Sequence, residues 1–402
     1  MILQTDKMID KQLEENMGLT ENKKVEIFQK IVQFDTENSN EASVAEYIGS
    51  LFEKFENVKI DYIEAEENRK SVVVTINGKN KGDKVLAFSG HEDTVSAGDS
   101  SSWKYNPFSA EIHDGILYGR GADDMKGGLS ALVSAALDVV TDGSDFAGTL
   151  KLIATVGEET SEIGATQVTQ SGALDDVTAM ILGEPRKNFE IGYTNKGVID
   201  YRVYSSGKSA HSSVPEKGIN AINALRKVMD RFDEYFDTLT EKNEVLGYFT
   251  NAFTLIKGGE QLNQIPDKAE LGGNMRTIPE TPNDQVISKL ESIIAELNES
   301  EEAELKLEIV FPELPLPVQP VSVFTKLAQA KIKEVSGFNG DLVAGTGTNE
   351  ASEFIKGESE FPILIFGPES DDCAHAVNEH LKVETYLQAA KIYTEIIKSY
   401  LV

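Results

Sequence analysis

Cysteine is almost absent from this chain of 402 residues: Cys373 is the only one, so the chain cannot form a disulfide within itself. Long apolar runs are also missing, because no stretch approaches the roughly 18 residues that a membrane-spanning helix needs. The start, MILQTDKMIDKQLEEN, lacks the basic residues and the apolar stretch of a secretion signal. These absences predict a soluble protein of the cytoplasm with no membrane partner.

Positive charge is scarce. The chain has 38 Lys+Arg against 67 Asp+Glu, and its formal net charge is −29 at pH 7. A chain of this charge repels phosphate backbones, so we expect neither nucleic acid nor an anionic membrane as a partner. Hydrophobic residues make up 40% of the sequence, which is ample for a core, and the length corresponds to two or three domains.

Short β-rich runs alternate with helical stretches in the first half of the chain. Strands are predicted at Ser71–Ile76, Lys84–Phe88, Leu150–Val156 and Ala179–Leu182, and apolar residues recur at helical spacing over Met125–Val140. This alternation predicts the α/β class, with a sheet covered on both faces and ligands beyond the carboxyl ends of the strands.

A segment with a different order of predicted strands and helices interrupts this pattern. Residues 197–313 read as strand, helix, strand, strand, helix, strand, the order of a βαββαβ unit. The alternation of helix and strand resumes after Pro315 and Pro317. We therefore expect a main domain of residues 1–196 and 314–402, interrupted by a smaller α+β domain of residues 197–313.

Histidine and carboxylate side chains follow several of the predicted strands. His91 and Asp93 come directly after one of them, where a histidine can bind a metal while a carboxylate orients its imidazole. Glu158 and Glu159 follow another strand. In extended chain their side chains would point opposite ways, so that one can bind metal and the other can reach a bound water. Glu184 follows a third strand. Taken singly, each also fits a plain structural role, as a hydrogen-bonded loop histidine or a solvated glutamate.

The glycine-rich stretch Gly119–Gly128 contains Asp123 and Asp124 and leads into a helix. Such a turn can bind phosphate, but two adjacent aspartates would repel it and suit a cation better. An aspartate pair that caps the helix is the structural alternative. Near the end of the chain, His375 and His380 follow another apolar run, and either could be a ligand.

These residues gain weight together, because the ends of parallel strands meet at one edge of a sheet. Two histidines and three carboxylates can bind a pair of divalent metal ions about 3.5–4 Å apart, with one carboxylate bridging them, as in metal-assisted hydrolysis. Nitrogen and oxygen ligands without a thiolate favour zinc, with cobalt or manganese as alternatives.

The motifs, in this order, resemble the zinc aminoacylase family, which includes succinyl-diaminopimelate desuccinylase, acetylornithine deacetylase, carboxypeptidase G and several dipeptidases. The resemblance extends from about residue 22 to the end and rests on Ser89–Val95, Gly119–Gly128, Gly157–Glu159, Gly183–Pro185, Ala210–Pro215 and His375–Glu379. It implies a zinc-binding α/β domain interrupted by a lid and dimerisation domain, and hence a homodimer. The residues in these motifs are most similar to those of the desuccinylase branch. That similarity implies hydrolysis of N-succinyl-LL-2,6-diaminopimelate to succinate and LL-diaminopimelate in lysine biosynthesis. Deacetylation of acetylornithine and hydrolysis of dipeptides are the alternatives.

The resemblance also implies a role for each matching residue. His91 and Glu184 would bind one Zn²⁺, Glu159 and His375 the other, and Asp124 would bridge the two ions of each subunit. Asp93 would orient His91, and Glu158 would act as the general base. In the lid, His211 resembles the residue that reaches the partner's active site and stabilises the oxyanion. The substrate-binding positions would be Asn263, Arg276, Gly347 and Thr348, although Asn349 replaces an aspartate that many relatives have in that last loop.

Two other classes of function remain open on the sequence. A non-catalytic metal-binding protein would not need Glu158 beside five ligand candidates, and nucleotide binding would rest on Gly119–Gly128 alone. His113 and His380 match no ligand position of the family, and we interpret both as surface or packing residues.

Overall fold

The computed structural model describes residues 18–402 except 38, 144, 301 and 346. The N-terminal stretch considered above and Thr346 of the substrate loop lie outside the described residues. The chain divides into two compact units. The larger unit holds the described residues up to Tyr193, together with Gln319–Val343 and Asn349–Val402, and the smaller unit holds Thr194–Val318 and Ala344–Thr348.

The larger unit is of the α/β class, as predicted, and its main sheet is mixed. Its strands, as far as the chain is described, follow the order β1 (Val58–Glu66), β2 (Arg69–Asn77), β6 (Ala147–Thr155), β3 (Asn80–His91), β7 (Ala179–Pro185), β18 (Ile363–Gly367), β8 (Ile191–Asn195) and β17 (Leu342–Gly345). β3 runs parallel to β6 and β7, and β18 runs parallel to β7. Their carboxyl ends therefore share one edge of the sheet, whereas β2 and β8 run antiparallel to their neighbours β6 and β18.

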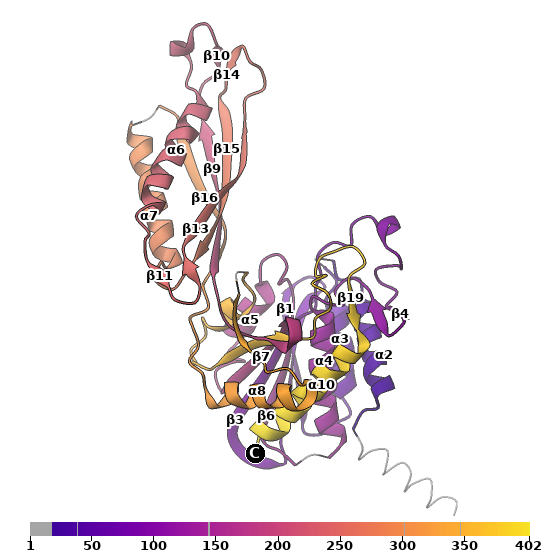
Figure 1. Ribbon diagram of the computed structural model, residues 1–402. Coiled ribbons are helices and arrows are strands. Elements are labelled where there is room, and N and C mark those ends of the chain that lie inside the picture. The colour runs from indigo at the N-terminus through magenta and orange to yellow at the C-terminus, as the bar shows by residue number, and fades with distance from the viewer. Residues whose placement is uncertain (1–17, 38, 144, 301, 346) are drawn as a thin grey trace, which may run out of the picture. The chain divides into compact units, whose positions relative to one another are not determined.

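Both faces of this sheet are buried, which explains why the central strands are almost continuously apolar. On β3, Leu86 and Phe88 face the main core, and Ala87, which points the opposite way, is equally buried. α4 (Lys126–Thr141) packs on β3, β6 and β7, and α5 (Ile163–Gln170) packs on β1, β2 and β6. In Figure 1 the C-terminal helix α10 (Val383–Tyr400), drawn in yellow, lies beside α4 from the first half of the chain.

The remaining elements of the larger unit complete its cover. The helices are α2 (Glu21–Val32), α3 (Ala42–Phe52), α8 (Val323–Ser336) and the short α9 (Ala351–Phe354), with 3-10 turns at Ser100–Ser102 and Lys187–Phe189. A small sheet pairs β4 (Glu111–His113), β5 (Ile116–Tyr118) and β19 (His380–Lys382). β1, β8 and β17 were not predicted from the sequence. β1 lies at an edge of the sheet and alternates half-buried with exposed residues, so its sequence is far more polar than that of a central strand.

The smaller unit has the predicted βαββαβ order. β9 (Gly197–Ser206), α6 (Ala221–Phe236), β13 (Thr250–Gly258), β15 (Lys268–Thr277), α7 (Asn283–Ser300) and β16 (Glu304–Glu313) form an antiparallel sheet with two helices. α6 and α7 pack on the sheet through an apolar core that includes Tyr201, Leu271 and Phe232. Short pairs join β10 (Ala210–His211) to β14 (Gln264–Ile265) and β11 (Lys242–Asn243) to β12 (Gly247–Tyr248), and a 3-10 turn covers Pro215–Lys217.

The smaller unit is slightly larger than the 197–313 segment expected from the sequence. It begins at Thr194 and also takes in Ala344–Thr348, because the amide of Lys196 donates to the carbonyl of Gly345 at 3.2 Å. The two parts of chain are distant in sequence, so their pairing leaves no local signal. The lid and dimerisation roles stay predictions.

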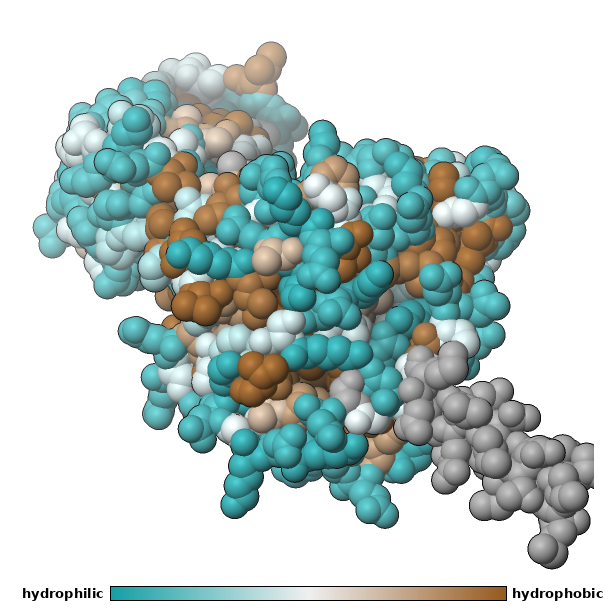
Figure 2. Space-filling model, turned by 60° about the horizontal axis from the view of Figure 1, so that its bottom comes forward, coloured by the Kyte–Doolittle hydropathy of each residue, from teal (hydrophilic) through white to brown (hydrophobic). Residues whose placement is uncertain are grey.

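The surface agrees with the composition. Figure 2 shows hydrophilic residues over most of one face, with hydrophobic residues in smaller groups between them. In the part of the chain that the structure describes, no helix combines the length and apolar character needed to cross a bilayer.

Candidate metal centre

His91 ends β3 at the shared edge of the sheet and is fully buried. Its Nδ1 lies 3.0 Å from the backbone carbonyl of Asp93, which can only accept, so Nδ1 carries a proton and Nε2 is the atom available to a metal. Nε2 lies 3.3 Å from Oδ1 of Asp124. Burial alone would lower the pKa of His91, but Asp124 and Asp93 raise it well above its usual value. A metal at Nε2 would take the place of that second proton.

The carboxylate of Asp93 has a wider role than the sequence indicated. Its Oδ1 lies 3.6 Å from Nδ1 of His91, but its shorter contacts are with the Gly157–Glu159 turn. Oδ1 accepts the amides of Gly157 and Glu158 at 2.9 and 3.1 Å, and Oδ2 accepts that of Glu159 at 3.1 Å. Burial would raise the pKa of Asp93, but His91 and these donors lower it. Asp93 therefore positions the imidazole through its carbonyl and the glutamate turn through its carboxylate.

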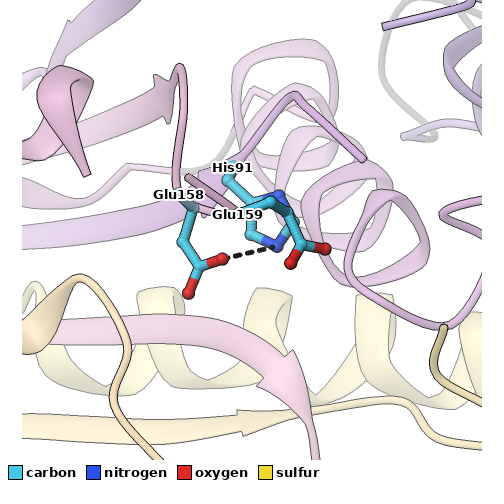
Figure 3. A group of neighbouring side chains, drawn as sticks. All are labelled: His91, Glu158 and Glu159. Atoms are coloured by element: carbon cyan, nitrogen blue, oxygen red, sulfur yellow. Dashed lines mark ion pairs between the residues drawn. The ribbon is translucent and has the colours of Figure 1, made fainter. Parts of the chain in front are cut away.

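Glu158 and Glu159 lie in this turn and not in extended chain, so the sequence-based reason for their opposite orientations is wrong. The strand ends at Thr155, and Gly157 takes a left-handed φ of 76°, which reverses the chain. Oε2 of Glu158 lies 4.0 Å from Nε2 of His91, and Oε1 of Glu159 lies 2.9 Å from Nε2 of His375. Figure 3 shows both glutamates beside the imidazole of His91.

Asp124 lies between the two histidines. Oδ1 faces His91 and Oδ2 lies 3.3 Å from Nε2 of His375, so each oxygen is directed at a different imidazole. Burial would raise the pKa of Asp124, but the contacts with His375 and His91 lower it. This arrangement is the one that a bridging carboxylate needs.

Glu184 lies within β7 and is buried, and among the described residues its Oε1 has no hydrogen-bond partner. Burial, and next to it the charge of Asp124, raise its pKa to about 8. Burial and the neighbouring carboxylates likewise raise the pKa of Glu158 well above its usual value. Such a concentration of buried carboxylates is unfavourable unless cations compensate it.

The five predicted ligands come together in two groups that share one residue. His91, Asp124 and Glu184 form one group, and Asp124, Glu159 and His375 form the other. In each group, one ligand atom of every residue lies within 4.8 Å of the others. Two imidazoles, three carboxylates and an unpartnered buried oxygen fit a pair of divalent cations bridged by Asp124.

The remaining predicted site residues lie in the smaller unit. His211, on β10, and Asn263 are both exposed, and their loops are joined by the amide of Ser212, which donates to the carbonyl of Asn263 at 3.0 Å. Arg276 is half-buried near the far end of β15, roughly 25 Å of strand away from Lys268. Gly347 and Thr348 lie in the Ala344–Thr348 segment. The unit therefore groups His211 with Asn263 but separates both from Arg276.

Several residues near these sites were not identified from the sequence. Lys196 lies near Arg276, because Arg276 pairs with Val198 and Thr277 with Gly197 across β15 and β9. Burial, and next to it the charge of Arg276, lower the pKa of Lys196. Arg120 and Glu379 form a buried ion pair next to the metal groups. No local motif signals these contacts. His113 stacks on Tyr105 and His380 packs beside Tyr118, and neither belongs to the two metal groups.

Comparison with known proteins shows which family this chain belongs to. The model of peptidase family M20/M25/M40 matches residues 87–399. This chain belongs to that family. A protein named probable succinyl-diaminopimelate desuccinylase from Staphylococcus aureus is 32% identical, over 95% of this chain and 98% of its own length. The resemblance found in the sequence is confirmed, and the chain is a metal-dependent hydrolase.

Solved structures support the fold. An M20 family metallo-carboxypeptidase from Sulfolobus solfataricus matches with a TM-score of 0.80 at 19% identity, covering 94% of this chain and 99% of that one. A dinuclear metal binding peptidase of the M20 family from Bacillus subtilis matches with a TM-score of 0.68 at 17% identity, covering 95% and 98%. At these identities the likeness concerns the fold alone.

Proposed function

We propose that the protein hydrolyses the amide bond of an N-acyl amino acid, with N-succinyl-LL-2,6-diaminopimelate as the substrate and succinate and LL-diaminopimelate as the products. The observation that carries this proposal is the pair of metal-ligand groups joined by Asp124, with the further carboxylate of Glu158 beside them. The names of its relatives support the choice of acyl group.

Two Zn²⁺ per subunit would be bound, one by His91 and Glu184 and one by Glu159 and His375, with Asp124 bridging. Cobalt or manganese could replace zinc at such oxygen and nitrogen ligands. When bound, the ions would lower the pKa of a shared water toward about 7 and polarise the amide carbonyl.

Glu158 is the general base in this proposal. Its half-buried carboxylate, with a raised pKa, can take a proton from the attacking water and return it to the leaving amine. Asp93 prepares Glu158 for this by holding the amides of the Gly157–Glu159 turn, which limits where the carboxylate can move.

The substrate's carboxylates need local cations, because a net charge of −29 provides no long-range attraction. Arg276 offers a planar guanidinium suited to a carboxylate, and Lys196 adds a second positive charge nearby. Gly347 and Thr348, the other proposed substrate-binding residues, lie in a loop of the same unit.

We further propose that the protein is a homodimer formed through the smaller unit. Asn263 lies in the loop just before β14, ahead of the start of β15, whereas Arg276 lies near the carboxyl end of β15, so one subunit cannot close both on a single carboxylate. In a dimer, His211 and Asn263 of one subunit would complete the site of the other, with His211 stabilising the oxyanion. A cytoplasmic location stays a prediction.

The test is amine release by the purified protein with added zinc or cobalt. N-succinyl-LL-diaminopimelate, N-acetylornithine and several dipeptides are compared side by side at equal concentration. The proposal expects the highest kcat/KM for the succinylated substrate. A preference for acetylornithine or a dipeptide would contradict the acyl group, and no activity on any substrate would contradict the amidohydrolase assignment.

A further inference from the structure

A buried carboxylate from the end of the chain organises the turn that carries Asp124. Glu379 is fully buried, four residues beyond His375. Its Oε1 accepts the amides of Asp123 and Asp124 at 2.9 and 3.0 Å, and its Oε2 accepts that of Gly121 at 3.0 Å. The backbone of the bridging aspartate is thus fixed by a side chain 255 positions away.

Arg120 binds the same carboxylate and also reaches the loop of His375. Its Nη1 donates to Oε2 of Glu379 at 2.5 Å. Nη2 donates to the carbonyl of His375 at 3.2 Å, and Nη1 also lies 3.3 Å from the carbonyl of Ala376. Arg120 is 2% exposed, so these contacts are made almost without competition from water.

The loop needs such support because of its backbone. His375 and Asn378 have left-handed φ values of 61° and 65°, a region that non-glycine residues seldom adopt unless surrounding contacts impose it. The carbonyl that Arg120 holds belongs to His375 itself. The guanidinium therefore restrains the residue whose imidazole faces Asp124 and Glu159.

We propose that the Arg120–Glu379 pair is a positioning device for one half of the metal centre, the group of Asp124, Glu159 and His375. The inference rests on the proposed two-metal site. The pair restrains the backbone of two of this group's three members. Asp124 also belongs to the other group, but His375 does not, and the other members of that group, His91 and Glu184, are placed by β3 and β7. Loss of the pair should weaken the metal ion held by Glu159 and His375 far more than the one held by His91 and Glu184.

The chain provides a reporter for this pair. The guanidinium of Arg120 lies 5.1 Å from the ring centroid of Trp103, which is the only tryptophan in the sequence. Its indole N–H donates to the carbonyl of Ala97 at 2.8 Å, so the ring is fixed from the other side. Trp103 fluorescence should therefore respond when the Arg120 side chain moves.

The experiment uses the full-length protein stripped of metal and titrated with zinc by calorimetry, and with cobalt by absorption spectroscopy. The variants are Arg120→Lys, which keeps the positive charge but loses the planar guanidinium with its two Nη donors, and Glu379→Gln, which keeps one acceptor oxygen. Asp138→Asn is the control, because Asp138 forms a buried ion pair with Lys24 between α4 and α2, away from the ligands.

We expect both variants to bind the first ion within about threefold of the wild type, and the second ion about 10- to 100-fold more weakly, as is usual when a partner of a ligand is removed. The tryptophan spectrum should change in both variants and stay unchanged in Asp138→Asn. Equal weakening of both ions, or a second ion bound as in the wild type, would overturn the inference. Wild-type protein that binds fewer than two ions would instead overturn the two-metal proposal.

A measurement on the wild type covers the case in which the variants do not fold. The amides of Gly121, Asp123 and Asp124 should be protected from hydrogen exchange even in metal-free protein, because Glu379 accepts them. Exchange of these amides as fast as that of an exposed turn would contradict the role of Glu379.

Discussion

Oε1 of Glu159 lies 2.9 Å from Nε2 of His375, although 216 residues separate them in the sequence. Glu159 comes from the turn after β6, whereas His375 comes from the loop after β18. Their contact joins two edge loops of the sheet, and Asp124 lies within reach of both side chains. Substitutions in the two loops should therefore have separable effects on metal binding and turnover.

Replacing Glu158 with Gln should strongly lower turnover while both metal ions stay bound. The base need not be a metal ligand, and its removal should lower kcat by about 10²- to 10⁴-fold. Metal content by mass spectrometry and kcat are measured on the same sample. Turnover near that of the wild type would contradict the assignment of Glu158 as the base.

Replacing Glu159 with Ala should, in contrast, lower the amount of bound metal. The Asp124, Glu159 and His375 group then loses a carboxylate, so the protein should retain fewer metal ions after dialysis. Glu158→Gln is the matched neighbour with full metal content. If Glu159→Ala remains fully loaded, Glu159 is not a ligand.

Mixing two inactive proteins tests the dimer. His211→Ala and Glu158→Ala should each be inactive, but subunit exchange at equal amounts should restore activity to about a quarter of the wild-type level. Half of the dimers would then be mixed, and one of the two sites in each would be complete. No recovery, with exchange confirmed by native mass spectrometry, would show that the site is not shared.

Replacing Arg276 with Gln should raise KM for the succinylated substrate about 10- to 150-fold, corresponding to the roughly 1.5–3 kcal/mol of a hydrogen bond to a charged group. kcat should change less. Arg202→Gln is the control, because Arg202 lies on the neighbouring strand β9 of the same sheet and pairs with Glu270. An unchanged KM for Arg276→Gln would remove it from the substrate site.

Removing metal with a chelator should destabilise the larger unit, since both ligand groups lie in it. A cation present at 100 times its Kd stabilises the folded form by about 2.7 kcal/mol. Thermal unfolding should therefore begin at a lower temperature after chelation and recover when zinc is added. Identical melting curves with and without chelator would contradict metal binding by these groups.

The sequence was most informative where a histidine or a glutamate closely follows a predicted strand. His91, Glu158, Glu159 and Glu184 follow short β-rich runs that were predicted as strands, and parallel pairing brings the ends of these strands together. The βαββαβ order of the smaller unit was readable for a similar reason, because each helix and strand has its own apolar period.

The supporting contacts could not be predicted in this way. Glu379 binds amides of the Gly121–Asp124 turn and Asp93 binds those of Gly157–Glu159, and in both cases the partners are far apart in the sequence. Every non-proline residue offers the same backbone N–H, whatever its side chain. No sequence pattern therefore indicates which carboxylate will accept a hydrogen bond from a given amide. The turn at Glu158 was missed because it depends on the left-handed φ of Gly157.

The position of β18 has a consequence for how the protein is made. β18 lies between β7 and β8 in the interior of the sheet, yet it begins at Ile363, after the whole smaller unit has been synthesised. A nascent chain on the ribosome therefore has an open sheet, with β7 unpaired on one side, until about nine-tenths of its length has emerged. His375 and Glu379 follow within the next 16 residues. Closure of the sheet and completion of the metal centre are thus consecutive, late events, and a chain truncated before Ile363 has neither.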